Sequence, residues 1–123
     1  MTVQDKPPRK TGIAHFFAAA GYSLGGLQRL SKESAFRQEV ALIAGLLVLF
    51  LALGASLPEV LGMLAIGLAL IAVEALNTAI EVLVDHLSPG WSQFAKDAKD
   101  LGSLAVACTI GGLLIYSAVV LIW

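Results

Sequence analysis

Residues 101–123, LGSLAVACTIGGLLIYSAVVLIW, form an uncharged stretch that decides the fold class of this chain. A helix needs about 20 apolar residues to cross the roughly 30 Å hydrocarbon core of a bilayer, and this stretch is long enough. Residues 40–58, VALIAGLLVLFLALGASLP, form a second such stretch, and residues 60–84 form a third that acidic side chains interrupt. The sequence therefore predicts an all-α integral membrane protein with three transmembrane helices, which we place at about 36–55, 59–86 and 98–122.

The composition of the chain excludes an ordinary soluble domain. Hydrophobic residues make up 58% of the 123 residues, and charged residues make up 14%, against about a quarter in a typical soluble domain. The net charge of −1 argues against a nucleic-acid partner. One cysteine, Cys108, lies in an apolar stretch, so we expect neither a disulfide framework nor a thiolate metal cluster.

The basic residues predict how the chain is oriented in the membrane. We expect a polar N-terminal tail at residues 1–10, followed by a single membrane domain at residues 11–123. All eight Lys and Arg residues precede the uncharged stretch 40–58 or lie between the apolar stretches 60–84 and 101–123. Because basic residues are retained on the cytoplasmic side, we predict a multi-pass protein with a cytoplasmic N-terminus and a periplasmic C-terminus. The polar opening and the length of the apolar stretches argue against a cleaved signal peptide.

Residues 13–31 differ from the spans and predict an amphipathic helix on the cytoplasmic surface. Apolar side chains share one face, while His15, Tyr22 and Arg29, spaced seven residues apart, lie on the opposite face. Glycines weaken this helix, and we expect a break near Gly25. A simple surface anchor remains an alternative for this segment.

Residues 72–86, AVEALNTAIEVLVDH, place polar side chains where a span is normally apolar. Glu74, Asn77, Glu81 and Asp85 follow helical spacing and share one face over about 16 Å of rise. An ionised carboxylate near mid-bilayer costs roughly 2.5–3.5 kcal/mol, so this polar stripe indicates a functional site. Three interpretations stay open: polar contacts that hold an oligomer together, a proton or cation pathway, or a phosphate-handling site with carboxylate-bound Mg²⁺.

The polar stripe also predicts self-association. Lipid cannot satisfy polar groups at this depth, so the stripe must face protein or water. A chain with three spans offers little interior in which to bury such a stripe. We therefore expect an oligomer.

The segment KESAFRQE, residues 32–39, predicts charged groups where the first span begins. Arg37 can extend its stem along the membrane and place its guanidinium at the interface. Glu33 lies four residues before Arg37, a spacing that allows an ion pair on one helix face.

The segment AKDAKDLGS, residues 95–103, predicts a similar charged cluster where the third span begins. Asp97 or Asp100 is placed to cap that helix. The polar stripe and the two charged segments, 32–39 and 95–103, are predicted to meet at the cytoplasmic side of the membrane. Together they offer carboxylates for Mg²⁺, an ammonium group for phosphate and, further into the bilayer, one more acid. This convergence favours the phosphate-handling site, although no P-loop or protein-kinase motif is present.

Four blocks resemble the bacterial integral-membrane diacylglycerol kinase family, in its diacylglycerol branch rather than its undecaprenol kinase branch. They are AAGYS at 19–23, ESAFRQE at 33–39, VEALNTAIEVLVD at 73–85 and AKDLGSLAV at 98–106. The resemblance implies one membrane kinase domain per subunit and a homotrimeric bundle in the bacterial inner membrane, with active sites between subunits. It implies transfer of the ATP γ-phosphate to the hydroxyl of diacylglycerol at the cytoplasmic face, with Mg²⁺ as cofactor and phosphatidic acid as product.

The resemblance also assigns roles to individual residues. Glu74 matches the general base, and Glu33 and Glu81 match the carboxylates that hold the metal on ATP. The nucleotide-binding positions that it implies are Tyr22, Glu33, Asn77, Glu81, Asp85, Lys99 and Asp100. The lipid-substrate positions that it implies are Ala19, Ala20, Gly21, Tyr22, Ser23, Ala35, Phe36, Arg37, Gln38, Glu39, Glu74 and Ser103.

Two positions depart from the family pattern. His15 and Ala18 stand where the surface helix of the family commonly carries Arg and Lys, which reduces its fixed positive charge.

Two alternative functions stay open beside the diacylglycerol kinase. One is an undecaprenol kinase, and the other, of a different class, is a small cation or proton conductor that uses Glu74 and Glu81.

Overall fold

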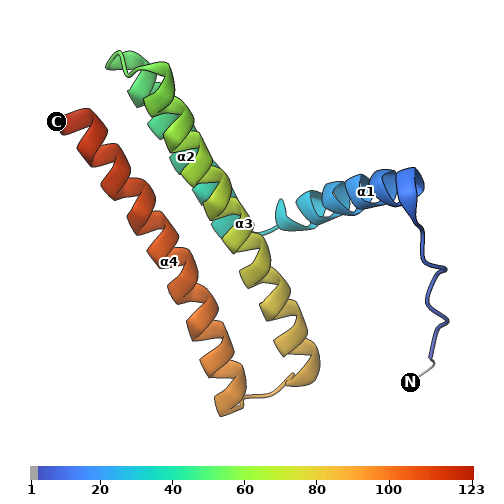
Figure 1. The fold of residues 1–123 in the computed structure, drawn as a ribbon. Coiled ribbons are helices and arrows are strands. Elements are labelled where there is room, and N and C mark those ends of the chain that lie inside the picture. The colour runs from blue at the N-terminus through green and yellow to red at the C-terminus, as the bar shows by residue number, and fades with distance from the viewer. Residues whose placement is uncertain (1–2) are drawn as a thin grey trace.

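The computed structural model describes residues 3–123 and consists of four helices joined by short connections. They are α1 (Gly12–Leu30), α2 (Ser34–Ala52), α3 (Leu57–Leu87) and α4 (Gln93–Ile122). Both α2 and α4 pack against α3, whereas α1 projects sideways from this bundle (Figure 1). The helices α2, α3 and α4 are each long and apolar enough to cross a membrane. This confirms the all-α class and the three predicted spans.

The helix α4 begins earlier than predicted, and this changes the role of two acids. Ser92 is the residue before the helix, and its Oγ accepts a hydrogen bond from the Ala95 backbone N–H at 3.3 Å. Asp97 and Asp100 therefore lie inside α4, and the prediction that one of them caps it is wrong. Serine is a favoured N-cap residue, and the AKDAKD segment that follows continues the helix.

The helix α1 is continuous, so the predicted break near Gly25 is wrong. Each helical glycine costs about 1 kcal/mol relative to alanine, which weakens a helix without requiring that it end. The chain enters α1 through Gly12, whose φ of +66° suits glycine. Of the tail predicted at residues 1–10, the first two lie outside the described residues, and the rest has no regular secondary structure.

One end of the bundle, at the connection between α2 and α3, has an apolar core. Its fully buried members are Phe50, Met63, Leu70 and Leu113. We call this the apolar end. The chain turns there through Gly54, whose φ is +74°, and the turn leads into a reciprocal capping box between Ser56 and Glu59 at the start of α3.

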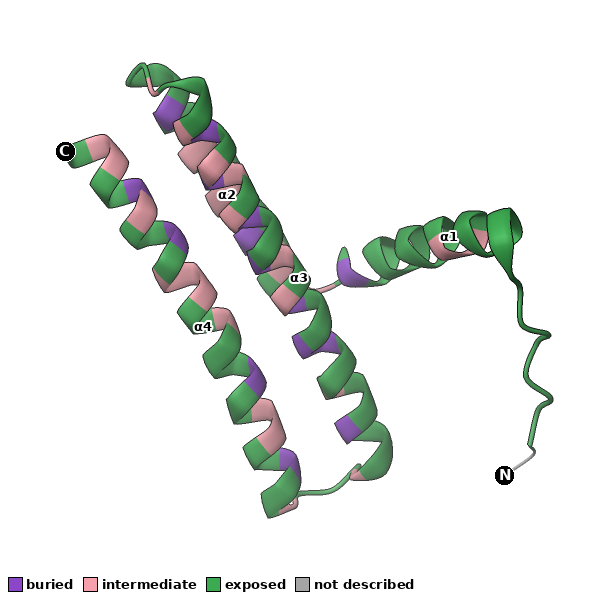
Figure 2. Ribbon diagram, viewed as in Figure 1, coloured by how far each residue is buried: buried purple, intermediate pink, exposed green. Residues whose placement is uncertain are grey.

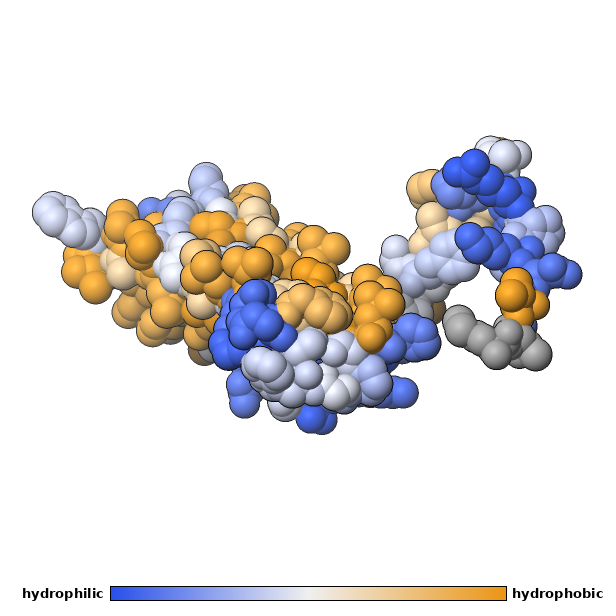
Figure 3. Space-filling view, turned by 90° about the horizontal axis from the view of Figure 1, so that it is seen from below, coloured by the Kyte–Doolittle hydropathy of each residue, from blue (hydrophilic) through white to orange (hydrophobic). Residues whose placement is uncertain are grey.

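The other end of the bundle, at the connection between α3 and α4, carries the polar side chains, and we call it the polar end. Viewed from this side, hydrophilic residues gather over the connection, while hydrophobic residues cover the flanks of the bundle (Figure 3). Buried positions line the faces that the helices turn toward one another, and the outer faces are exposed (Figure 2). Exposed apolar flanks on helices of this length suit contact with lipid or with further protein.

Candidate active site

A cleft of about 390 Å³ opens in the polar half of the bundle. It is bordered by α2 with the residue before it, by α3 and by α4. The lining residues are Glu33, Ser34, Ala35, Gln38, Glu39, Leu42, Glu74, Asn77, Glu81, Ser103, Val106 and Ile110. The cleft thus brings together residues from three of the four sequence blocks that carry the family resemblance.

Two carboxylates meet deep in this cleft. Glu74 of α3 is 4% exposed and Glu39 of α2 is 5% exposed, and the two are close neighbours. Glu39 Oε2 has no hydrogen-bond partner within residues 3–123. The family resemblance implied for Glu39 only a lipid-binding position, and its burial as a second acid was not predicted. The available signal was its place as the last charge before the uncharged stretch 40–58.

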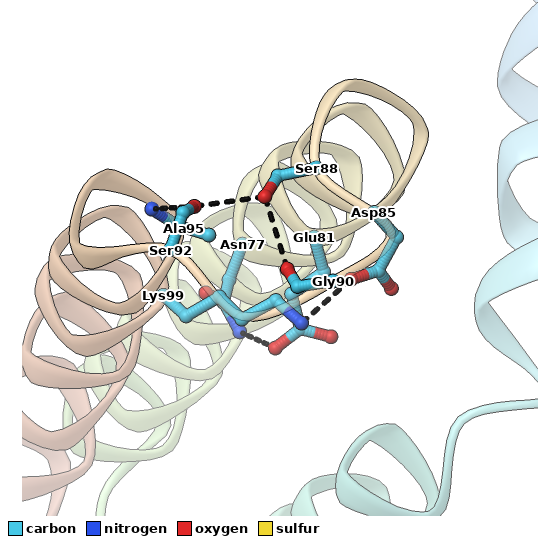
Figure 4. Close-up of polar contacts among 8 residues, drawn as sticks. All are labelled: Asn77, Glu81, Asp85, Ser88, Gly90, Ser92, Ala95 and Lys99. Carbon is cyan, nitrogen blue, oxygen red and sulfur yellow. Dashed lines mark hydrogen bonds and ion pairs between the residues drawn. The ribbon is translucent and has the colours of Figure 1, made fainter.

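Asn77 and Glu81 are linked along α3. Asn77 Nδ2 donates a hydrogen bond to Glu81 Oε1 at 3.3 Å (Figure 4). Asn77 is buried at 7% exposure, and Glu81, one turn closer to the polar end, is partly buried. The amide therefore fixes one oxygen of a carboxylate that borders the cleft.

Glu33 reaches the cleft from the connection between α1 and α2. Its Oε1 pairs with Arg29 Nη1 at 2.6 Å, and the described chain does not form the ion pair with Arg37 that the spacing allows. The connection is so tight that the backbone N–H of Glu33 bonds the carbonyl of Leu30 at 2.9 Å. This turn keeps Arg29, near the end of α1, within reach of Glu33.

Two further ion pairs lie at the polar end of the bundle, near the connection between α3 and α4. Lys99 of α4 pairs with Asp85 of α3 at 2.6 Å (Figure 4), and Lys96 pairs with Asp100 along α4 at 2.5 Å. All four side chains are substantially exposed, so each pair contributes little to stability. Asp85, Lys99 and Asp100 do not line the cleft of this single chain, although they lie at the same end of the bundle.

Several other predicted site residues also lie outside the cleft. Ser23 of α1 borders a separate apolar groove against α3, and Tyr22 is 71% exposed. The predicted positions that do not line the cleft are Ala19, Ala20, Gly21, Tyr22, Ser23, Phe36, Arg37, Asp85, Lys99 and Asp100.

The single chain already buries much of the polar stripe. Glu74 is 4% exposed and Asn77 is 7% exposed. Glu81 is only partly buried and Asp85 is exposed, so the single chain covers the deeper half of the stripe and leaves the shallower half open. The oligomer predicted from the stripe stays a prediction.

The side chains at the cleft fit a hard divalent cation bound to a nucleotide. The described part of the chain contains no group of three or more His, Cys, Asp or Glu side chains arranged to hold a metal. Glu33 and Glu81 nevertheless offer two carboxylates on one cleft. Mg²⁺ prefers oxygen ligands and is commonly held by one or two carboxylates together with substrate phosphates. This donor set suits Mg²⁺ that arrives with a phosphorylated substrate.

Comparison with known proteins identifies the family. A family model described as prokaryotic diacylglycerol kinase matches residues 21–121. A diacylglycerol kinase of Sinorhizobium sp is 46% identical over 115 residues, covering 94% of this chain and 84% of the relative. Diacylglycerol kinases of Pseudomonas aeruginosa and Escherichia coli (strain K12) are 41% and 39% identical, covering 82% and 81% of this chain and 85% and 83% of the relatives. The resemblance drawn from four sequence blocks is confirmed, and the chain belongs to the prokaryotic diacylglycerol kinase family.

Proposed function

We propose that this protein transfers the γ-phosphate of ATP to the hydroxyl of diacylglycerol, giving phosphatidic acid and ADP. The observation that carries the proposal is the meeting of Glu33, Glu74 and Glu81 at one cleft, between helices long enough to span a membrane. Two relatives that cover more than four fifths of this chain at about 40% identity are named diacylglycerol kinase. The site thus combines metal-binding chemistry with access from lipid.

Within the cleft we assign the general base to Glu74. The hydroxyl oxygen of the lipid forms a bond to the γ-phosphorus, the bond to the ADP oxygen breaks, and Glu74 accepts the hydroxyl proton. Glu74 lies deeper than Glu81, because seven residues of helix correspond to about 10 Å of rise. The cleft is also lined there by Leu42, Val106 and Ile110, which suit the apolar part of a lipid.

We assign the nucleotide to the shallower part of the cleft. Glu33 and Glu81 would hold Mg²⁺, which when bound offsets the negative charge of the phosphates. Asn77 orients Glu81 through the hydrogen bond from Nδ2. Lys99 lies at the polar end, where its ammonium group can attract phosphate.

We further propose a homotrimer in the bacterial inner membrane, with the polar end at the cytoplasmic face. All Lys and Arg residues lie on one side of the spans, and this supports the orientation. The exposed apolar flanks of the three spans leave wide surfaces for contact between copies. In such an assembly the α1 residues that miss the cleft of their own chain, such as Tyr22, are candidates to complete the cleft of a neighbour.

The decisive experiment uses the purified full chain in detergent micelles with Mg²⁺ and γ-labelled ATP. Diacylglycerol and undecaprenol are supplied separately, and labelled lipid is separated from ATP. We expect label in phosphatidic acid, and little in undecaprenyl phosphate. Label mainly in undecaprenyl phosphate would assign the chain to the other kinase. No labelled lipid, together with ATP-independent ion flux in liposomes, would support a conductor.

A further inference from the structure

Gly102 of α4 lies directly against the side chain of Asn77 of α3, beside the cleft. Gly102 is buried, and a Cβ at this position would overlap Asn77 Oδ1 and lie 3.1 Å from Asn77 Cγ. A side chain at residue 102 would therefore force the Asn77 amide to rotate or the two helices to separate. Gly102 itself lies next to Ser103, which lines the cleft.

The two ends of the Asn77 amide have unequal surroundings. Nδ2 donates to Glu81 Oε1 at 3.3 Å, whereas Oδ1 is buried without a hydrogen-bond partner in the described chain. Burying an acceptor without a partner is unfavourable, so helix packing alone gives no reason for an amide here. The arrangement is explained if the Asn77 Nδ2 group is required to donate its hydrogen bond to Glu81 (Figure 4).

We propose that Gly102 is a positioning residue for Glu81 and acts through Asn77. The missing side chain lets the amide lie between α3 and α4 with its donor end on Glu81. One carboxylate oxygen of Glu81 is then held, and the other stays available to a ligand in the cleft. This inference rests on the proposed function, in which Glu81 is a ligand of nucleotide-bound Mg²⁺.

The first test is Gly102→Ala, with metal binding as the readout. The probe is Mn²⁺ with a non-hydrolysable ATP analogue, measured by electron paramagnetic resonance on the full chain in detergent micelles. Loss of a group that orients a metal ligand typically weakens metal affinity by about 10- to 100-fold. We expect a weakening of this size. In the kinase assay we expect a parallel rise in the Mg²⁺ concentration for half-maximal rate, with the KM for diacylglycerol within about twofold of the parent value.

The second test asks whether Gly102 acts through Asn77. In Asn77→Ala the atom that a Cβ at residue 102 would overlap is absent, so adding Gly102→Ala should change metal affinity no further. If Gly102 were needed only for helix packing, Gly102→Ala would lower metal affinity by the same factor in the parent and in Asn77→Ala, since independent effects add. If Gly102→Ala alone fails to fold, the double variant still should, and its comparison with Asn77→Ala decides the matter.

Gly62 provides a matched control at the apolar end. It lies on α3, and a Cβ there would overlap the Tyr116 hydroxyl of α4. Gly62→Ala therefore perturbs the same helix pair, and we expect lower thermal stability with unchanged affinity for Mn²⁺ and nucleotide. Equal losses of affinity in both glycine variants, or additive losses in the Asn77→Ala background, would overturn the inference.

The outcomes also separate this inference from the proposed function. A parent protein that binds Mn²⁺ and nucleotide in a manner dependent on Gly102, yet phosphorylates no diacylglycerol, would overturn the proposed substrate alone. An active parent protein whose Gly102→Ala variant keeps full metal affinity would overturn the role of Gly102 alone.

Discussion

The two ends of the helical bundle use the same helices to bury opposite kinds of side chain. At the apolar end the fully buried residues are Phe50, Met63, Leu70 and Leu113. In the polar half, Glu39 and Glu74 are buried almost as completely. The helix α3 runs from one environment to the other without interruption.

This difference separates packing from function. Buried apolar side chains in a membrane bundle hold helices together through close contact. Buried carboxylates raise the cost of inserting the chain, and Glu39 keeps one oxygen without a partner in residues 3–123. The polar half is therefore less stable than apolar packing would make it, and we attribute this to its role in the reaction. Substitutions in the polar half should change turnover and metal dependence, and substitutions at the apolar end should change thermal stability.

The largest effect is expected for Glu74→Gln. The change is nearly isosteric and removes the proton acceptor, and loss of general-base catalysis typically costs about 10²- to 10⁴-fold in rate. We expect turnover to fall by this factor while binding of Mn²⁺ with an ATP analogue survives. Ser117→Ala is the control, because among the described residues the buried Ser117 hydroxyl donates only to the Leu113 carbonyl of its own helix, at 2.8 Å. If Glu74→Gln kept substantial turnover, the general-base role would have to be abandoned.

A smaller loss of rate that depends on metal is expected for Glu81→Gln. The variant removes one full negative charge from the proposed Mg²⁺ site, so turnover at limiting Mg²⁺ should fall at least about 10²-fold, the upper end of the range for losing a group that only orients a metal ligand. Raising Mg²⁺ should restore part of the loss, and Glu33→Gln should behave similarly. Asp97→Asn is the control, because within residues 3–123 Asp97 accepts a hydrogen bond only from Gln93, on the exposed face of α4. A normal Mg²⁺ requirement in both glutamate variants would contradict the metal assignment.

The sequence predicted the spans well because their physical signal is strong. Uncharged stretches of about 20 residues have few alternatives to a membrane helix. The ends of α2, α3 and α4 differ from those of the predicted spans by at most five residues, at the start of α4. The start of α4 was misplaced because Ser92 is a polar cap that lies before the charged AKDAKD segment, where hydropathy gives no signal. The prediction of a break near Gly25 was wrong because the modest free-energy cost of a helical glycine was taken as enough to end the helix.

The candidate site was predictable along one helix and poorly predictable between helices. Helical spacing placed Glu74, Asn77 and Glu81 on one face, and all three line the cleft. No such rule fixes contacts between segments. The ion pair of Glu33 with Arg29 depends on the turn after α1, and the contact of Asn77 with Gly102 depends on how closely α3 and α4 approach.

A loss of stability without loss of turnover is expected for Leu113→Ala at the apolar end. Leu113 is fully buried in contact with the core of that end, and truncating a buried leucine costs about 2–5 kcal/mol, part of it for the cavity that remains. We expect a lower midpoint of thermal unfolding in detergent. Turnover per folded protein should match the parent, because the cleft lies in the other half. A large drop in turnover with unchanged stability would mean that the two ends are not separable.

The smallest effect is expected for Tyr116→Phe, which removes one hydrogen bond at the apolar end. The Tyr116 hydroxyl donates to the Glu59 backbone carbonyl at 2.9 Å and so ties α4 to the first turn of α3. The phenylalanine keeps the ring that stacks on Phe50 with centroids 6.4 Å apart. Loss of one such hydrogen bond costs about 0.5–1.5 kcal/mol, and the lower part of this range applies because the helical carbonyl keeps its own backbone partner. We expect a small decrease in the unfolding midpoint, with Mg²⁺ dependence and turnover both unchanged. A shift in Mg²⁺ dependence approaching that of Glu81→Gln would show that the apolar end controls the cleft, and the division between packing and chemistry would fail.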